Sequence, residues 1–224
     1  MQQLDKEVVV EARGTAIRGT LTFPREAHGL VIFAHGCGSI RHSPRNRFVA
    51  EQLNAAGLVT LLLDLLSPEE DDEDRSTARF RFDIGLLSER VVAAIDQTAS
   101  QPETEGLPQG LFGASTGAAA ALGAAAARPE RVGAVVIRGG RPDLAGDALP
   151  RVAAPTLLIV GGADPVVLAL NREAAARMTC EHRLHVIPGA GHLFEEPGAI
   201  QEVARLARDW FVEHLVGRSD PGDV

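Results

Sequence analysis

The sequence predicts an α/β protein with a mostly parallel, twisted sheet and helices on both faces. Short apolar runs recur along the chain, and most are followed by a longer stretch with helical spacing. Alternation of this kind builds βαβ units with right-handed crossovers. The central runs are apolar throughout, which is typical of strands that are buried on both faces.

The strands and helices can be assigned in order. Residues 7–24 alternate in polarity and indicate two antiparallel strands that turn near Arg13 and Gly14. Later strands are expected over residues 30–36, 58–64, 109–112 and 133–139, and at the starts of 155–164 and 183–192. Helices are expected over residues 46–56, 79–100, 116–128, 168–178 and 199–216. The acidic run at 69–74, EEDDED, is interpreted as a solvated loop, with an interaction surface as the alternative.

The composition fits one domain over residues 1–217, followed by a short flexible tail at 218–224. Apolar residues make up 45% of the chain, and the net charge of −8 argues against nucleic acid as a partner. No signal peptide or membrane-spanning segment is recognisable, so we expect a cytoplasmic protein without a membrane partner. Cys37 and Cys180 have no CxxC spacing and predict neither a zinc site nor a disulfide.

The segment LFGASTGAAAALGAAAA, residues 111–127, is either a low-complexity linker or a structured segment whose small residues hold a serine in place. Alanine favours helices, whereas flexible linkers favour glycine and serine, so a helix is predicted after the serine. Ser115 then lies in a G-x-S-x-G pattern between a strand and a helix, the context of a nucleophile elbow. The alternative is a glycine-rich turn in which the serine is incidental.

A serine nucleophile requires a histidine to accept its proton and an acid to orient that histidine. Asp164 and His192 each follow an apolar strand, at the edge where open α/β sheets place their sites. Their chain order after Ser115 is that of α/β-hydrolases. Asp143 follows the preceding strand and is the alternative acid, and a buried turn is the alternative role for His192. The other six histidines are expected at the surface.

The loop HGCGS, residues 35–39, follows the strand at 30–36 and is predicted to complete an oxyanion hole. Thr116, the residue after the nucleophile, would donate one backbone N–H and Cys37 the other. The Cys37 thiol is a rival nucleophile, although it lacks an elbow.

The segments LVIFAHGCGS, GASTG, GGADP and GAGH resemble the α/β-hydrolase superfamily, and within it the small dienelactone-hydrolase-like enzymes, over nearly the whole chain. The stretches RHSPRN, DIGLL and RGGRPDLAGDALP are similar to a bacterial branch sometimes fused to phosphoribosyltransferase domains. The resemblance implies the α/β-hydrolase fold and serine-dependent ester hydrolysis, with no metal or organic cofactor. Dienelactone hydrolases proper carry cysteine where this chain has Ser115, so their lactone substrate is not carried over. Cys37 also stands where a smaller or hydroxylated residue is expected.

These features predict a carboxylesterase that cleaves small or short-chain esters through an acyl-enzyme. The interval 141–155 is too short for a cap domain, so an open, shallow site is expected. Candidate substrate-binding residues are Gly38, Arg41, Arg138 and Arg141, and Arg45 lies near them; arginines can bind an anionic substrate group in a bidentate manner, or be salt-bridged instead.

Alternative functions are a thioesterase, lactonase or acyltransferase with the same triad, and a non-catalytic binding or accessory module. The sequence leaves monomer or homodimer open.

Overall fold

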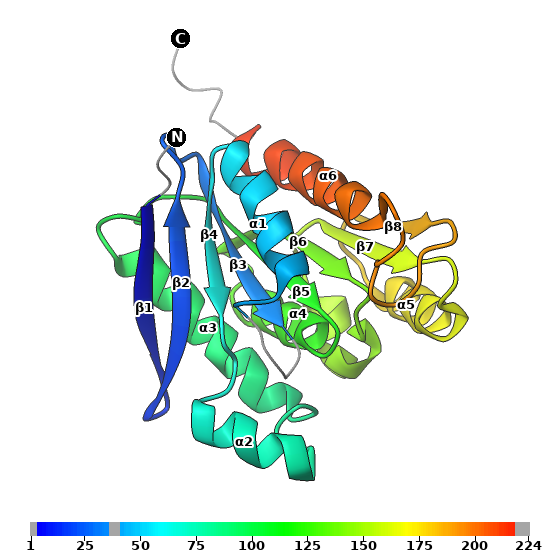
Figure 1. Ribbon diagram of the computed structural model, residues 1–224, viewed down its shortest axis with the longest axis horizontal. Helices are drawn as coiled ribbons and strands as arrows, with labels where there is room; N and C mark the ends of the chain where they lie inside the picture. Colours follow the sequence, from blue (N-terminus) through cyan, green and yellow to red (C-terminus); the bar gives the residue numbers. More distant parts are fainter. Residues whose placement is uncertain (1–3, 36–40, 218–224) are drawn as a thin grey trace.

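Within residues 4–35 and 41–217, which the computed structural model describes, eight strands form one sheet in the order β1-β2-β4-β3-β5-β6-β7-β8 (Figure 1). The strands are β1 (Leu4–Ala12), β2 (Thr15–Phe23), β3 (Gly29–His35), β4 (Leu58–Leu63), β5 (Gln109–Ala114), β6 (Val132–Arg138), β7 (Thr156–Gly161) and β8 (His182–Ile187). β2 is antiparallel to β1 and β4, and the other neighbours are parallel. The predicted mostly parallel sheet is therefore confirmed.

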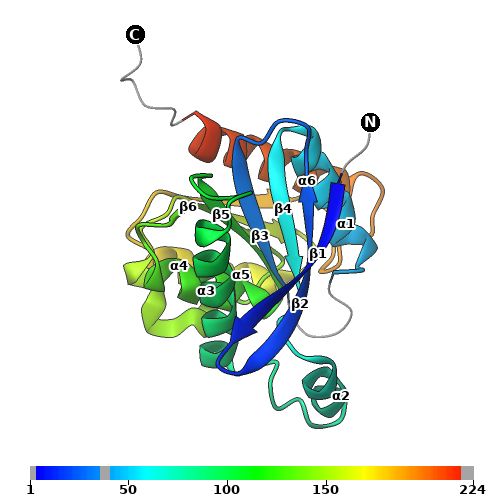
Figure 2. The ribbon, with the colours of Figure 1, turned by 90° about the vertical axis from the view of Figure 1, so that its left-hand side faces the viewer.

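Helices cover both faces of this sheet (Figure 2). α1 (Pro44–Ala55) and α6 (Ala199–Phe211) pack on one face, and α3 (Ile84–Ser100), α4 (Gly117–Ala127) and α5 (Pro165–Arg177) on the other. Every residue of β3, β4, β5 and β7 is buried, as the unbroken apolar runs predicted. The β1–β2 hairpin turns at Arg13 and Gly14, where both φ angles are positive, as a two-residue hairpin turn with matching twist requires.

The interpretation of the acidic run 69–74 as a loop was wrong, because the run lies in α2 (Pro68–Thr77). Ser67 and Glu70 form a reciprocal capping box at its start, and carboxylates in a first turn are stabilised by the helix dipole. The run is also not uniformly solvated. Asp74 is fully buried, and Glu70 accepts a 2.6 Å bond from the buried Arg90.

The connection between β6 and β7 holds only a short 3₁₀ segment, η1 (Pro142–Arg151), so no separate cap interrupts the sheet there. At the end of the described chain, α6 continues into a π-helical turn, η2 (Val212–Val216). The predicted tail at 218–224 lies outside the described residues. None of the described helices combines the length and the apolar character needed to cross a membrane.

Candidate active site

Ser115 lies in a strained turn between β5 and α4. Its φ is +53°, a region that costs a non-glycine residue on the order of 1–3 kcal/mol. Both glycines of the pattern are required by close packing. A Cβ at Gly113 would lie 2.7 Å from Ala118 Cα, and a Cβ at Gly117 would lie 2.4 Å from the Ala34 carbonyl oxygen. A strained serine on a strand-to-helix turn of this kind is the geometry of a nucleophile elbow.

Thr116 follows the serine and occupies the N-cap position of α4, where it is buried. The start of a helix carries partial positive charge, so the backbone here can stabilise a developing oxyanion. The two other residues predicted for this region, Cys37 and Gly38, lie outside the described residues.

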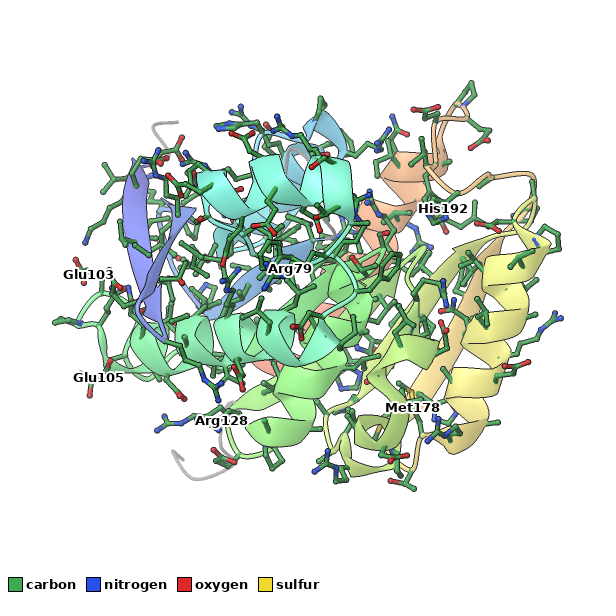
Figure 3. The ribbon with its side chains drawn as sticks, turned by 90° about the horizontal axis from the view of Figure 1, so that it is seen from below. Arg79, Glu103, Glu105, Arg128, Met178 and His192 are labelled. Carbon is green, nitrogen blue, oxygen red and sulfur yellow. The ribbon has the colours of Figure 1, made fainter. Side chains whose placement is uncertain are left out.

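Asp164 and His192 are in direct contact. His192 Nδ1 lies 2.9 Å from Asp164 Oδ2, and the other carboxylate oxygen accepts a 3.2 Å bond from the Val167 backbone N–H. Asp164 thus caps α5 with one oxygen and orients the imidazole with the other. Because a carboxylate can only accept, Nδ1 carries the proton in this bond, and Nε2 of the neutral ring is left as a base. Figure 3 labels His192 on the loop before α6.

Asp143, the alternative acid, is engaged elsewhere. Its two oxygens accept a bidentate pair of bonds, 2.9 and 2.7 Å long, from the Arg141 guanidinium. The structure therefore pairs His192 with Asp164 and gives Asp143 a different partner.

The tripeptide Gly139–Arg141, directly after β6, contacts both the serine turn and the histidine loop. The Arg141 N–H donates a 3.0 Å bond to the Ser115 carbonyl oxygen. Gly139 has φ +51°, and a Cβ there would lie 3.1 Å from the His192 carbonyl oxygen and 3.0 Å from the Phe194 ring. One short loop therefore brings together backbone segments that are far apart in the sequence.

Three of the four arginines discussed above are paired with carboxylates. Arg41 pairs with Glu7 and Asp64, Arg45 with Glu195, and Arg141 with Asp143. These three guanidinium groups are neutralised within the chain.

Arg138, at the end of β6, differs from the other three because it forms no ion pair among the described residues. Its Nη1 is buried without a hydrogen-bond partner there, and its guanidinium carbon lies 6.0 Å from the centre of the Phe194 ring. Burial, together with the charge of Arg45, lowers the pKa of Arg138 to about 10. The group remains a cation at neutral pH.

His35 was expected at the surface with the other histidines, and this prediction was wrong: it is 3% exposed. It ends β3, and the strand register places it beside Ala114, which in turn lies beside Arg138. Burial and the Arg138 charge lower the pKa of His35 to about 3, so the ring is neutral. His214 is likewise buried, against Trp210, far from the carboxyl edge of the sheet. The position of His35 at the end of an apolar strand was the available signal for its burial.

No cluster of three metal-ligating side chains occurs in residues 4–35 and 41–217. The chemistry visible in this part is that of a strained serine, a carboxylate-oriented imidazole and an unpaired guanidinium. Together these groups could support nucleophilic attack on a carbonyl carbon.

Comparisons with known proteins show the family of the chain. The model of the dienelactone hydrolase family matches residues 17–214. A putative phosphoribosyl transferase of Mycobacterium tuberculosis, found in two strains, is 56% identical over 218 residues, which are 97% of this chain and 48% of the relative. The chain therefore spans about half the length of the curated relatives it matches.

Solved structures give the same result. The crystal structure of a dienelactone hydrolase from Anabaena variabilis superposes with a TM-score of 0.93 at 55% identity, covering 96% of this chain and all of that one. A cold-adapted esterase from an Arctic intertidal metagenomic library shares the fold, with a TM-score of 0.73 at 18% identity, covering 96% of this chain and 100% of that one. The chain thus belongs to the dienelactone hydrolase family, within the α/β-hydrolase superfamily, and is by its family a hydrolase.

Proposed function

We propose that this chain is a serine esterase that uses Ser115, His192 and Asp164 as a catalytic triad. One observation carries the proposal: the strained Ser115 and the Asp164-bonded His192 are held by the same tripeptide after β6. The three residues follow three different strands, β5, β7 and β8, whose carboxyl ends lie at one edge of the sheet, and this supports the proposed triad.

In the proposed reaction, Ser115 Oγ attacks the ester carbonyl carbon while His192 Nε2 accepts the hydroxyl proton. Asp164 stabilises the imidazolium, and the backbone N–H groups of Thr116 and Cys37 bind the oxyanion. Collapse of the tetrahedral intermediate breaks the ester C–O bond, and His192 gives its proton to the leaving alcohol. Water, deprotonated by His192, then attacks the acyl-enzyme, releasing the acid and restoring Ser115.

For the substrate we propose small or short-chain esters, because η1 is too short to form a lid over the site. Of the four arginines, Arg138 is the one that we propose as an anion-binding group, because it alone lacks a carboxylate partner among the described residues. An ester whose acyl part carries a carboxylate would supply that partner.

The deciding experiment replaces the nucleophile. Ser115→Ala fits the same small turn and removes only the hydroxyl, so we expect folded protein with hydrolysis of p-nitrophenyl acetate reduced at least about 10³-fold. A fluorophosphonate probe should label wild type at Ser115, as read by mass spectrometry, and leave the variant unlabelled.

Substantial remaining activity in Ser115→Ala would refute the serine mechanism. Cys37→Ala then tests the rival thiol, since it keeps the backbone N–H and removes only the sulfur. A parallel panel of acyl thioesters, lactones and alcohol acceptors would separate the esterase from a thioesterase, lactonase or acyltransferase. The transferase named for the curated relatives is not proposed here, because the match covers only half of their length.

A further inference from the structure

Asn171 is a fully buried residue in the middle of α5, outside every motif that defines the site. Its Nδ2 donates a 3.0 Å bond to the Gly140 carbonyl oxygen, 31 residues away, and a 2.8 Å bond to the Val167 carbonyl oxygen. Both neighbours are acceptors, so the amide turns its NH₂ end, and not its oxygen, toward them.

Each of these two bonds is made to a residue that is bonded, itself or through the next residue, to a member of the proposed triad. On one side, the Val167 N–H donates to Asp164, whose other oxygen holds His192. On the other side, Gly140 is followed by Arg141, whose N–H donates to the Ser115 carbonyl oxygen.

Gly140 is also packed tightly against the nucleophile's helix, which limits how the tripeptide can move. A Cβ at Gly140 would lie 2.3 Å from Ala118 Cβ and 3.6 Å from the Ser115 carbonyl oxygen. A displacement of α5 that broke the Asn171–Gly140 bond would therefore move the acid, Asp164, while the serine turn stayed with α4 and the His192 loop stayed against Gly139.

We infer that Asn171 is a positioning residue: its amide fixes α5, and with it Asp164, the partner of His192, relative to the loop after β6 that contacts Ser115 and His192. The inference rests on the proposed function, since it concerns the geometry of the same triad. Catalysis is sensitive to such geometry, because a misplacement of about 1 Å can cost about 10²-fold in rate.

The test compares Asn171→Leu with Asn54→Leu. Asn54 is a matched control, because it is also buried and its Nδ2 donates a 2.8 Å bond to the Leu58 carbonyl oxygen. Leu58 begins β4, so this bond lies at the amino ends of the strands, away from the proposed triad. Both variants lose a buried amide of the same size, so both should melt at a lower temperature. The kinetic constants for p-nitrophenyl acetate are measured per folded molecule, well below each melting temperature.

We expect Asn171→Leu to lower kcat about 10–100-fold with KM changed by no more than about twofold. Asn54→Leu should leave both constants close to wild type. Asn171→Asp, which sets an oxygen against two carbonyl oxygens, should lose at least as much as Asn171→Leu. Should Asn171→Leu not fold, the smaller Asn171→Ser decides, because its shorter side chain leaves the Gly140 carbonyl oxygen without its bond.

Wild-type kcat in the folded Asn171 variants, or equal losses at Asn54 and Asn171, would overturn the inference. Those outcomes leave the proposed function intact as long as Ser115→Ala is inactive. An active Ser115→Ala would instead overturn the proposed function itself, so the two failures are distinguishable.

Discussion

Two regions of the molecule differ in whether their arginine side chains are paired with carboxylates. Around α2, two arginines are paired with carboxylates: Arg90 with Glu70 at 2.6 Å and Arg81 with Asp74 at 2.8 Å. At the end of β6, Arg138 has none among the described residues, and its charge helps to lower the pKa of His35, two strands away, to about 3. In the first region the two guanidinium groups are neutralised within the chain. In the second, one guanidinium has no carboxylate partner among the described residues.

The difference separates structural from functional charge. A buried cation without a partner costs folding free energy, whereas a paired one is compensated by its partner and hydrogen bonds. The unpaired Arg138 lies next to Ala114 on the neighbouring strand β5, and Ala114 directly precedes Ser115. The α2 region is therefore the place where substitutions should alter stability, and the β6 region the place where they should alter catalysis.

The largest expected effect lies at the acid of the triad. Asp164→Asn should reduce kcat by about 10⁴-fold, because an amide can hold the wrong histidine tautomer. Asp143→Asn should cost less than about tenfold, since Asp143 bonds Arg141 and not His192. Initial rates on p-nitrophenyl acetate measure both, with circular dichroism as the check on folding. Comparable losses in the two variants would mean that the acid had been misassigned.

A smaller effect is expected at Arg138. Arg138→Gln should reduce kcat/KM for p-nitrophenyl hemisuccinate about 10–100-fold more than for p-nitrophenyl butyrate, because only the former carries a carboxylate. Arg141→Gln should leave that ratio unchanged, since Arg141 is already paired with Asp143. If Arg138→Gln lowers kcat/KM equally for both esters, Arg138 acts by packing on Phe194 and does not recognise an anion.

Local patterns predicted the parts of the site that depend on neighbouring residues. The serine turn was recognisable because Gly113 and Gly117 are needed by the turn itself, next to an apolar strand and an alanine-rich helix. The helix in the acidic run also had a local signal, the Ser67–Glu70 capping box, but the interpretation as a loop rested on the charge of the segment alone.

What depends on tertiary contact could not be predicted in the same way. Asp143 and Asp164 both follow strands, and only the folded chain brings one of them to 2.9 Å from His192. Asn171 sits inside a helix without any motif, and its partner Gly140 is 31 residues away. The pairing of Arg41, Arg45 and Arg141 likewise follows from packing, so the sequence could not single out Arg138.

The smallest effect on activity is expected in the α2 region, at Asp74. Its side chain is 1% exposed and accepts bonds from the Phe80 and Arg81 backbone N–H groups and from the Arg81 guanidinium. Asp74→Ala leaves these donors unsatisfied, so it should lower the free energy of unfolding by on the order of 3 kcal/mol at pH 7. The kcat of the folded variant should equal that of wild type.

The pH dependence of this loss gives a second check on the comparison. Burial acts to raise the pKa of Asp74, but the hydrogen bonds from Arg81 and Phe80 outweigh it and hold the pKa below its usual value of 3.8. A carboxyl whose pKa is depressed in the folded state stabilises the protein above 3.8, and this contribution disappears as pH falls through the lower folded value. Urea unfolding of wild type and Asp74→Ala should therefore differ most near neutral pH and converge in strong acid. A difference in the free energy of unfolding that stays constant down to strong acid, or a lower kcat in folded Asp74→Ala, would contradict the distinction between a structural α2 region and a catalytic β6 region.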